Sequence, residues 1–260
     1  VNGSLLEYFR IRARGGAGVL IAGATGIDPE RVNTHNVIQI HDDSFISGLK
    51  ELTGAVINEG GAIFCQLWHP GRYARSAEYS GAEAVAPSAV ASRFTGETPR
   101  ELSIEEIKKI IGWYSEAALR AKKAGFNGIE VTAASGYLPA QFLSAVTNLR
   151  NDKYGGNLQE RMTFLLEVVE AIRISAGREF PLIIRIGGSD FIPGGNTNSE
   201  AVEICKALEK AGVDAISMTG GWHETAVPQL TMEVPYASLA YLCKNIKQNI
   251  KIPVILSNRM

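Results

Sequence analysis

The stretch SIEEIKKIIGWYSEAALRAKKAGFNGIEV (Ser103–Val131) decides the fold of this chain, because it reads as one helix followed by one strand. Ser103 precedes Glu106 by three residues, which is the spacing of a capping box, and apolar residues follow at helical spacing. Gly125 marks the end of the helix, since glycine readily adopts the left-handed conformation found there. The apolar run Gly128–Val131 then has the length of a buried strand.

The same alternation of helix and strand extends along the whole chain. The predicted strands are Val19–Ala22, Ala62–Leu67, Gly128–Val131, Leu182–Ile186, Ala215–Met218 and Val254–Leu256. The predicted helices lie near residues 3–15, 44–59, 103–124, 157–176, 198–211 and 236–248. Such units build a parallel sheet covered by helices, and barrels of this kind commonly run to about 250 residues. We therefore predict an α/β fold with a single domain over residues 1–260. Six units do not close an eight-stranded barrel, so either the barrel is open or incomplete or the chain is a segment of a longer protein.

The composition limits the classes of partner. A net charge of −1 and a charged fraction of 20% argue against nucleic acid, which needs a basic surface. Cys65, Cys205 and Cys243 lie far apart, which indicates reduced and mostly buried thiols. We see no signal peptide and no apolar run of about 18 residues. We therefore expect a cytoplasmic protein with a small-molecule substrate and no membrane partner, and a homo-oligomer is compatible with the sequence.

Small or polar residues stand at the ends of the predicted strands. Gly23 follows the first strand, Gln66 lies in the second, Thr132 follows the third, and Asn258 and Arg259 follow the sixth. In a parallel barrel these positions converge on one rim, where ligands bind. The sequence therefore predicts a ligand site at this rim.

Arg185 is the most informative polar residue, because it lies inside the apolar strand LIIRIGG (Leu182–Gly188). A charge in a buried strand is costly unless it is paired. We expect Arg185 to meet an anion or an electron-rich ligand.

Several reaction classes are disfavoured. The histidines are scattered and form no HExxH motif, so no metal site is predicted; they are His35, His41, His69 and His223. No lysine ends a predicted strand, which argues against a Schiff-base aldolase. Ser135 lacks the preceding glycine of a nucleophile elbow, which argues against acyl transfer.

Tyr137 and His223 remain as groups that could move a proton. Tyr137 lies in an unusually long segment between strand and helix (Glu130–Arg161), and barrel enzymes carry catalytic residues on such loops. A tyrosine hydroxyl, with an ordinary pKa of about 10, suits proton donation to a carbanion as basic as an enolate. The alternative is structural, with Tyr137 covering the barrel mouth and His223 a hydrogen-bonded loop residue.

Four motifs in order along the chain carry a family resemblance. They are QLWHPGR (Gln66–Arg72), VAPSAV (Val85–Val90), GYLPAQFLSAVTNLRNDKYGGNLQERMTFLLEVVEAIR (Gly136–Arg173) and GWHETAVP (Gly221–Pro228). Together they resemble the Old Yellow Enzyme family of FMN-dependent oxidoreductases, and within it the 2-enoate reductase and 2,4-dienoyl-CoA reductase branch. The similarity runs from about Leu6 to Arg259. It implies a TIM-type (β/α)8 barrel, with about six of its eight units present and the first and last strands missing.

The resemblance also implies the chemistry. The cofactor would be FMN, contacted by Gly23, Gln66, Arg185, Asn258 and Arg259, with NAD(P)H as reductant. Hydride from FMN N5 would reduce the C=C bond of an α,β-unsaturated carbonyl or carboxylate, with Tyr137 as proton donor and His223 assisting at the carbonyl. The substrate side would be formed by His69, Arg72, Thr132, Ser135 and Trp222. A [4Fe–4S] cluster and FAD would belong only to a longer full-length protein.

The departures from the family pattern refine the expected branch. Most of the family has a histidine pair, or a histidine and an asparagine, where this chain has Thr132 and Ser135, and this points to the enoate and dienoyl-CoA branch. At two positions where dienoyl-CoA reductase has arginines associated with substrate contact, this chain has Val146 and Ala226 instead. This difference favours a free enoate or another unsaturated carbonyl over a CoA thioester as the substrate. The rival interpretations are a non-catalytic barrel fragment that binds a small ligand or partner, and a flavin-dependent amine-type dehydrogenase.

Overall fold

A parallel sheet with helices on one side forms the body of the molecule in the computed structural model, which describes residues 1–31, 37–78, 81–226 and 232–260. The strand order is β2-β1-β3-β6-β7-β8-β9, and every neighbouring pair is parallel. These strands are β1 (Val19–Gly26), β2 (Ile38–Gln39), β3 (Ala62–Trp68), β6 (Gly128–Ala133), β7 (Leu182–Gly187), β8 (Ala215–Thr219) and β9 (Val254–Leu256). The six predicted strands are confirmed, with β2 as a short addition at one edge.

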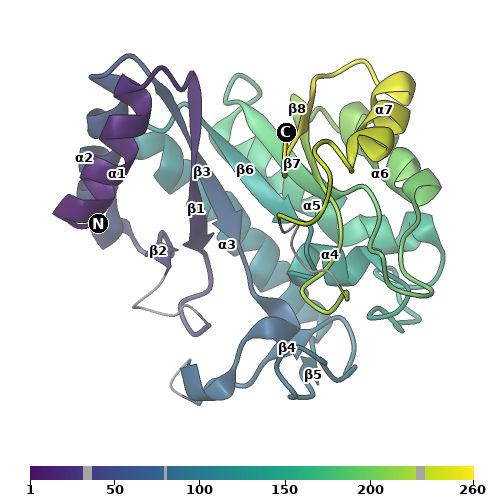
Figure 1. Cartoon of the computed structure of the whole chain (residues 1–260). Coiled ribbons are helices and arrows are strands. Elements are labelled where there is room, and N and C mark those ends of the chain that lie inside the picture. The colour runs from purple at the N-terminus through teal and green to yellow at the C-terminus, as the bar shows by residue number, and fades with distance from the viewer. Residues whose placement is uncertain (32–36, 79–80, 227–231) are drawn as a thin grey trace.

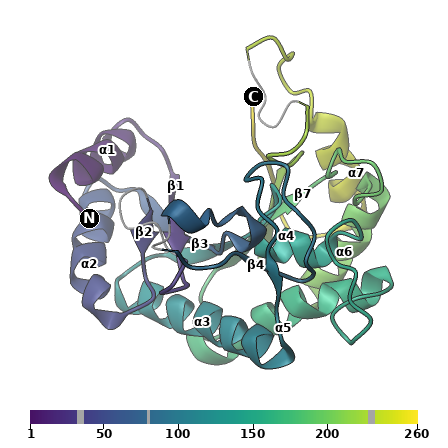
Figure 2. The same ribbon diagram turned by 90° about the horizontal axis from the view of Figure 1, so that it is seen from below.

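The helices lie outside the curved sheet. Seen from below, six of them form an arc that is open between α1 and α7, as in part of a barrel (Figure 2). They are α1 (Gly3–Arg14), α2 (Ile46–Ile57), α3 (Ile104–Lys123), α5 (Leu158–Ala176), α6 (Asn198–Lys210) and α7 (Ala240–Asn249). The predicted partial α/β barrel is confirmed. The last helix begins at Ala240 rather than at residue 236, and the second is preceded by a 3-10 turn (Asp43–Phe45).

Two kinds of residue pattern account for this architecture. The capping boxes at Ser103, Asn157 and Thr197 each satisfy two backbone groups and so fix where α3, α5 and α6 begin. Along β3, the alternate residues Ile63, Cys65 and Leu67 are fully buried toward the helices. The residues between them face the inside of the curve, where Gln66 lies.

The connections after the strands carry additional structure. The loop after β3 leads through 3-10 turns (Gly71–Tyr73 and Ser76–Glu78) to the short strands β4 (Val85–Ala86) and β5 (Arg100–Glu101), which pair with each other. This pair lies beyond the carboxyl ends of the main strands (Figure 1). The segment after β6 contains a further helix, α4 (Leu138–Leu143), which the sequence did not predict. The connections after β3 and β6 therefore carry secondary structure of their own at the carboxyl end of the sheet.

Cys65 and Cys205 are buried and Cys243 is partly buried, and all three are free thiols. Burial raises the pKa of Cys65 to about 12, so this thiol stays protonated and packs as a small apolar group.

Candidate active site

A cavity of about 350 Å³ lies at the carboxyl ends of the strands, which is within the size range of small-molecule sites. Its lining residues are Ile21, Gly23, Gln66, Glu130, Thr132, Ser135, Tyr137, Arg185 and His223. The fold thus brings together residues of four strands, the loop after β6 and the loop after β8. Seven predicted site residues meet here, and Glu130 joins them.

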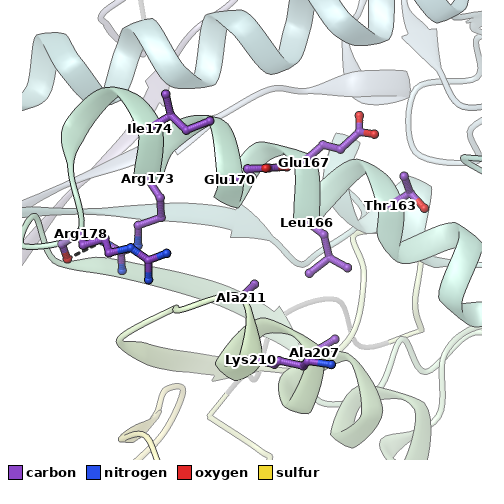
Figure 3. Close-up of a pocket in the computed structure, with 10 residues that line it drawn as sticks. All are labelled: Thr163, Leu166, Glu167, Glu170, Arg173, Ile174, Arg178, Ala207, Lys210 and Ala211. Atoms are coloured by element: carbon purple, nitrogen blue, oxygen red, sulfur yellow. Dashed lines mark hydrogen bonds between the residues drawn. The ribbon is translucent and has the colours of Figure 1, made fainter.

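A larger groove of about 760 Å³ lies on the outer surface between α5 and α6 (Figure 3). One of its two arginines, Arg173, donates hydrogen bonds to the carbonyl oxygens of Phe180 and Gly212 and pairs with Asp214 at 2.7 Å. These contacts tie helix ends to neighbouring turns. We place the candidate site in the smaller cavity, because polar groups from several strands converge there.

A polar network crosses the floor of the cavity. The amide of Gln66 donates from Nε2 to Oε1 of Glu130 at 2.6 Å, across the β3–β6 pair in which these residues are register partners. Arg185 donates to the hydroxyls of Ser217 at 3.1 Å and Ser257 at 3.2 Å. Among the described residues it forms no ion pair. Its guanidinium is thus held by neutral hydroxyls.

Glu130 is a site residue that the sequence reasoning missed. It is fully buried, and its Oε2 has no hydrogen-bond partner among the described residues. Burial raises the pKa of Glu130, while the Gln66 bond, the Arg185 charge and Ser217 oppose the rise. The signal was present, because a carboxylate in the apolar run GIEV (Gly128–Val131) is as unexpected as the arginine in LIIRIGG.

Tyr137 and His223 form a hydrogen-bonded pair in the wall of the cavity. The Tyr137 hydroxyl lies 2.9 Å from Nε2 of His223. Burial raises the pKa of Tyr137, opposed by a hydrogen bond with the side chain of Trp68, and burial lowers the pKa of His223, opposed by the charge of Glu224. Both groups are therefore biased toward their neutral forms, a protonated phenol beside a neutral imidazole.

Aromatic rings surround this pair. Trp68 and Tyr73 meet the Tyr137 ring edge to face, with ring centroids 5.4 and 5.9 Å away. Phe94 stacks on the His223 ring at 5.1 Å. The enclosure removes water from both polar groups and so strengthens the hydrogen bond between them.

The backbone before Tyr137 makes this placement possible. Ser135 and Gly136 both have positive φ angles, 58° and 85°. A Cβ at Gly136 would overlap the Tyr73 hydroxyl and lie 2.7 Å from Cε3 of Trp222. Only glycine fits this close approach, which turns the chain so that Tyr137 begins α4 facing the cavity.

Three residues predicted on the substrate side do not line this cavity. His69 is fully buried, with Nε2 3.0 Å from Asp28 and Nδ1 accepting from the Gly71 amide. Trp222 is buried and donates to Asp190 at 2.9 Å. Both side chains use their polar groups for protein partners, and their role on the substrate side stays a prediction.

Arg72 lines a different cavity, of about 490 Å³, and its role on the substrate side stays a prediction. It pairs with Glu224 at 2.6 Å, and the two side chains are only 4% and 7% exposed. It also donates to the carbonyl oxygen of Ala91, and Ser92 donates to Glu224. Arg72 therefore joins the connections after β3 and β8.

Asn258 and Arg259, which were also predicted to contact FMN, do not line the cavity. Asn258 donates to the Thr219 hydroxyl at 2.9 Å, and the Arg259 guanidinium stacks 4.4 Å from the Tyr236 ring. Both have positive φ angles, 71° and 46°. Neither lines the cavity floor with Arg185.

The cavity fits the flavin that the sequence resemblance implies. A Cβ at Gly23 would lie within 2.6 Å of the Gln66 side chain, so glycine at this position leaves room for Gln66 in the cavity wall. Two buried polar atoms that have no hydrogen-bond partner in the described part of the chain, Oε2 of Glu130 and Oγ1 of Thr132, border it. Arg185 adds a cation for an electron-rich ring edge.

Residues 1–31, 37–78, 81–226 and 232–260 contain neither a membrane-spanning helix nor a metal-binding cluster of side chains. No helix there is both long and apolar enough to span a bilayer. No cluster of three or more histidine, cysteine, aspartate or glutamate side chains there has the arrangement of a metal site. His35 and the end of GWHETAVP, Val227–Pro228, lie outside the described residues.

Comparison with known proteins agrees with this geometry. The family model of the NADH:flavin oxidoreductase / NADH oxidase family matches residues 1–260. A metal reductase of Desulforamulus reducens is 53% identical over 261 residues, covering 100% of this chain and 39% of the relative. An NADH oxidase of Thermoanaerobacter brockii is 40% identical over 258 residues, covering 98% and 40%.

Among solved structures, a 2-naphthoyl-CoA reductase in complex with 2-naphthoyl-CoA superposes with a TM-score of 0.95 and 36% identity, covering 100% of this chain and 42% of that protein. The chain thus spans about two fifths of the length of these three proteins. The match to the family model nevertheless extends over every residue of the chain. The chain therefore belongs to the NADH:flavin oxidoreductase / NADH oxidase family, oxidoreductases that use FMN with NAD(P)H as reductant.

Proposed function

We propose that this chain forms the FMN site of an ene-reductase that reduces the C=C bond of an α,β-unsaturated carbonyl or carboxylate. The observation that carries the proposal is the Tyr137–His223 pair, 2.9 Å apart in the wall of the same cavity as Arg185 and Gln66. Reduction of such a bond needs a hydride at the β-carbon and a proton at the α-carbon. When bound, FMN supplies the hydride chemistry between NAD(P)H and the substrate.

The polar floor of the cavity would hold the cofactor. Gln66 offers an amide whose nitrogen is already engaged by Glu130, so its oxygen is left to accept from a ring N–H. Arg185 places a positive charge that forms no ion pair within the described residues, which favours electron-rich and anionic ring systems. Gly23 lies in the cavity wall, and Asn258 and Arg259 approach from the end of β9.

The chain's own contribution to the reaction is the proton. With Nε2–H of His223 donating to the Tyr137 oxygen, the phenol hydrogen is free to point into the cavity toward the α-carbon. After transfer, the same N–H stabilises the phenolate that remains. The raised pKa of Tyr137 suits an acid that must stay protonated until a strong carbon base forms. Thr132 and Ser135 would border the substrate.

Tyr137→Phe tests this proposal in the FMN-loaded protein. Reduction of FMN by NAD(P)H should remain near normal, because it needs no proton from the phenol. Oxidation of the reduced protein by 2-cyclohexen-1-one should slow by roughly 10²-fold or more. An equal decrease in the rates of both half-reactions would contradict the assignment of Tyr137 as the proton donor.

A second candidate function is the reduction of a metal ion, which the 53% identity to the Desulforamulus reducens metal reductase favours. This reaction transfers electrons alone and needs no proton at carbon. Oxidation of the reduced protein by ferric citrate should therefore be unaffected by Tyr137→Phe. A protein that reacts quickly with ferric citrate and with no unsaturated carbonyl would favour this function over the first.

A further inference from the structure

Asp190 is a buried carboxylate that joins three connections around the site. It lies after β7, and its side chain receives hydrogen bonds from three donors. Oδ1 accepts from Nε1 of Trp222 at 2.9 Å, and Oδ2 accepts from the amide of Asn196 at 2.7 Å and the hydroxyl of Ser144 at 2.9 Å. Ser144 follows α4 and Trp222 follows β8. One side chain thus links the segments that carry Tyr137 and His223.

Trp222, which is held by Asp190, is in turn connected to the Tyr137–His223 pair through the backbone. It forms an isolated parallel β-bridge with Ser135, two residues before Tyr137. The backbone amide of His223 donates to the Ser135 carbonyl at 3.4 Å. Because the indole is 1% exposed and packs on Gly136, its position fixes where the His223 backbone lies.

We propose that Asp190 is a positioning residue, which holds His223 against Tyr137 by way of the Trp222 indole. The expected effect of Asp190 on the reaction rate rests on the proposed ene-reductase function. The Asp190–Trp222 contact is independent of that function. Asp190 touches neither the cavity nor its contents, so any effect on catalysis must pass through Trp222.

The surroundings of Asp190 explain why the contact is strong. Burial raises the pKa of Asp190 to about 6, opposed by its three donors, and the negative charge of Glu200 on α6 adds to the rise. Glu200 lies 3.4 Å from Arg161 of α5. On the β8 side, next to Trp222, stand His223 and Glu224. Above pH 6 the ionised carboxylate makes charge-assisted bonds, which are about twice as strong as neutral ones.

Asp190→Asn is the central variant. Each oxygen of Asp190 receives at least one N–H donor, so replacing either oxygen with an NH₂ group must break a contact. Trp222→Phe removes the indole donor and keeps a ring. Ser189→Ala is the matched control, because Ser189 lies in the same loop and, among the described residues, its hydroxyl bonds only to backbone groups of that loop.

The two half-reactions of the FMN-loaded protein provide the kinetic test. Asp190→Asn and Trp222→Phe should each slow oxidation by 2-cyclohexen-1-one by about tenfold, with FMN reduction by NAD(P)H within about twofold of the parent. The double variant should be no slower than the slower single variant, because both changes break the same contact. Ser189→Ala should leave both rates unchanged. Equal losses in both half-reactions, or additive effects in the double variant, would overturn the inference.

The indole signals of the three tryptophans, Trp68, Trp113 and Trp222, test the contact without any turnover. In ¹H–¹⁵N spectra, the signal lost in Trp222→Phe identifies the Trp222 N–H. That signal should move with a midpoint near pH 6 in the parent and stay fixed in Asp190→Asn. A Trp222 signal unaffected by Asp190→Asn would overturn the inference. Absence of alkene-driven oxidation in the parent would instead overturn the proposed function.

Discussion

The Tyr137 hydroxyl lies 2.9 Å from Nε2 of His223, although 86 positions separate the two residues in the chain. The contact exists because β6 and β8 both flank β7 and their connections fold back over the same end of the sheet. The Ser135–Trp222 bridge then sets the spacing of the two connections. A phenol and an imidazole thus meet in a partly buried pocket, where burial biases each toward its neutral form.

His223 should support the acid rather than replace it. His223→Ala removes the hydrogen bond that stabilises the phenolate, so we expect oxidation of the reduced protein by 2-cyclohexen-1-one to slow by about tenfold. The loss should be smaller than that of Tyr137→Phe. Stopped-flow flavin absorbance measures it, and oxidation by ferricyanide, which needs no proton at carbon, serves as the control. A His223→Ala protein as slow as Tyr137→Phe would contradict this division of roles.

Glu130 should influence the preference for reduced over oxidised FMN. Its negative charge partly offsets the positive charge of Arg185. Glu130→Gln removes that negative charge, so Arg185 should stabilise the electron-rich reduced ring more strongly. We expect the ratio of affinities for reduced and oxidised FMN to rise about tenfold at pH 8.5, or about 30 mV for the two-electron couple. Spectroelectrochemical titration measures the shift. Thr132→Val, a neutral change on the same strand, is the control, and an equal shift in both variants would refute a charge effect.

The buried ion pair between Arg72 and Glu224 should be costly to break. Glu224→Gln leaves the Arg72 guanidinium, 4% exposed, without its charged partner, and we expect a loss of about 3–5 kcal/mol in the free energy of unfolding. Urea denaturation measures the loss. Glu78→Gln is the matched control, because the Arg75–Glu78 pair is about half exposed and should contribute only about 0–1 kcal/mol. Similar losses in both variants would contradict the role of burial.

Stability should depend on Asp28 in acid. Burial alone would raise the pKa of Asp28, but the hydrogen bond and charge of His69, the Glu30 amide and the Arg31 charge together lower it below its ordinary value of 3.8. A depressed folded-state pKa stabilises the protein above 3.8, and this contribution is lost as pH falls further. The difference in unfolding free energy between parent and Asp28→Asn should therefore narrow below pH 3.8. A difference that stays constant down to pH 2 would contradict this origin.

Much of the candidate site could be predicted from the sequence because strand ends in a parallel barrel share one rim. Gln66, Thr132 and Arg185 were expected to converge there, and they do. His69, Arg72 and Trp222 were also predicted on the substrate side, but none of them lines this cavity, and that role stays a prediction. Membership of a motif does not fix the direction of a side chain, which depends on partners such as Asp28, Glu224 and Asp190.

The sequence by itself determined the order of helices and strands, since capping boxes and the period of apolar residues are local signals. It also determined the family, because the long segment around Tyr137 is specific. Only the tertiary structure decided which polar groups meet. The pairing of Gln66 with Glu130, of Tyr137 with His223 and of Trp222 with Asp190 depends on sheet register and loop packing. These pairings join residues far apart in the chain, so no local pattern records them.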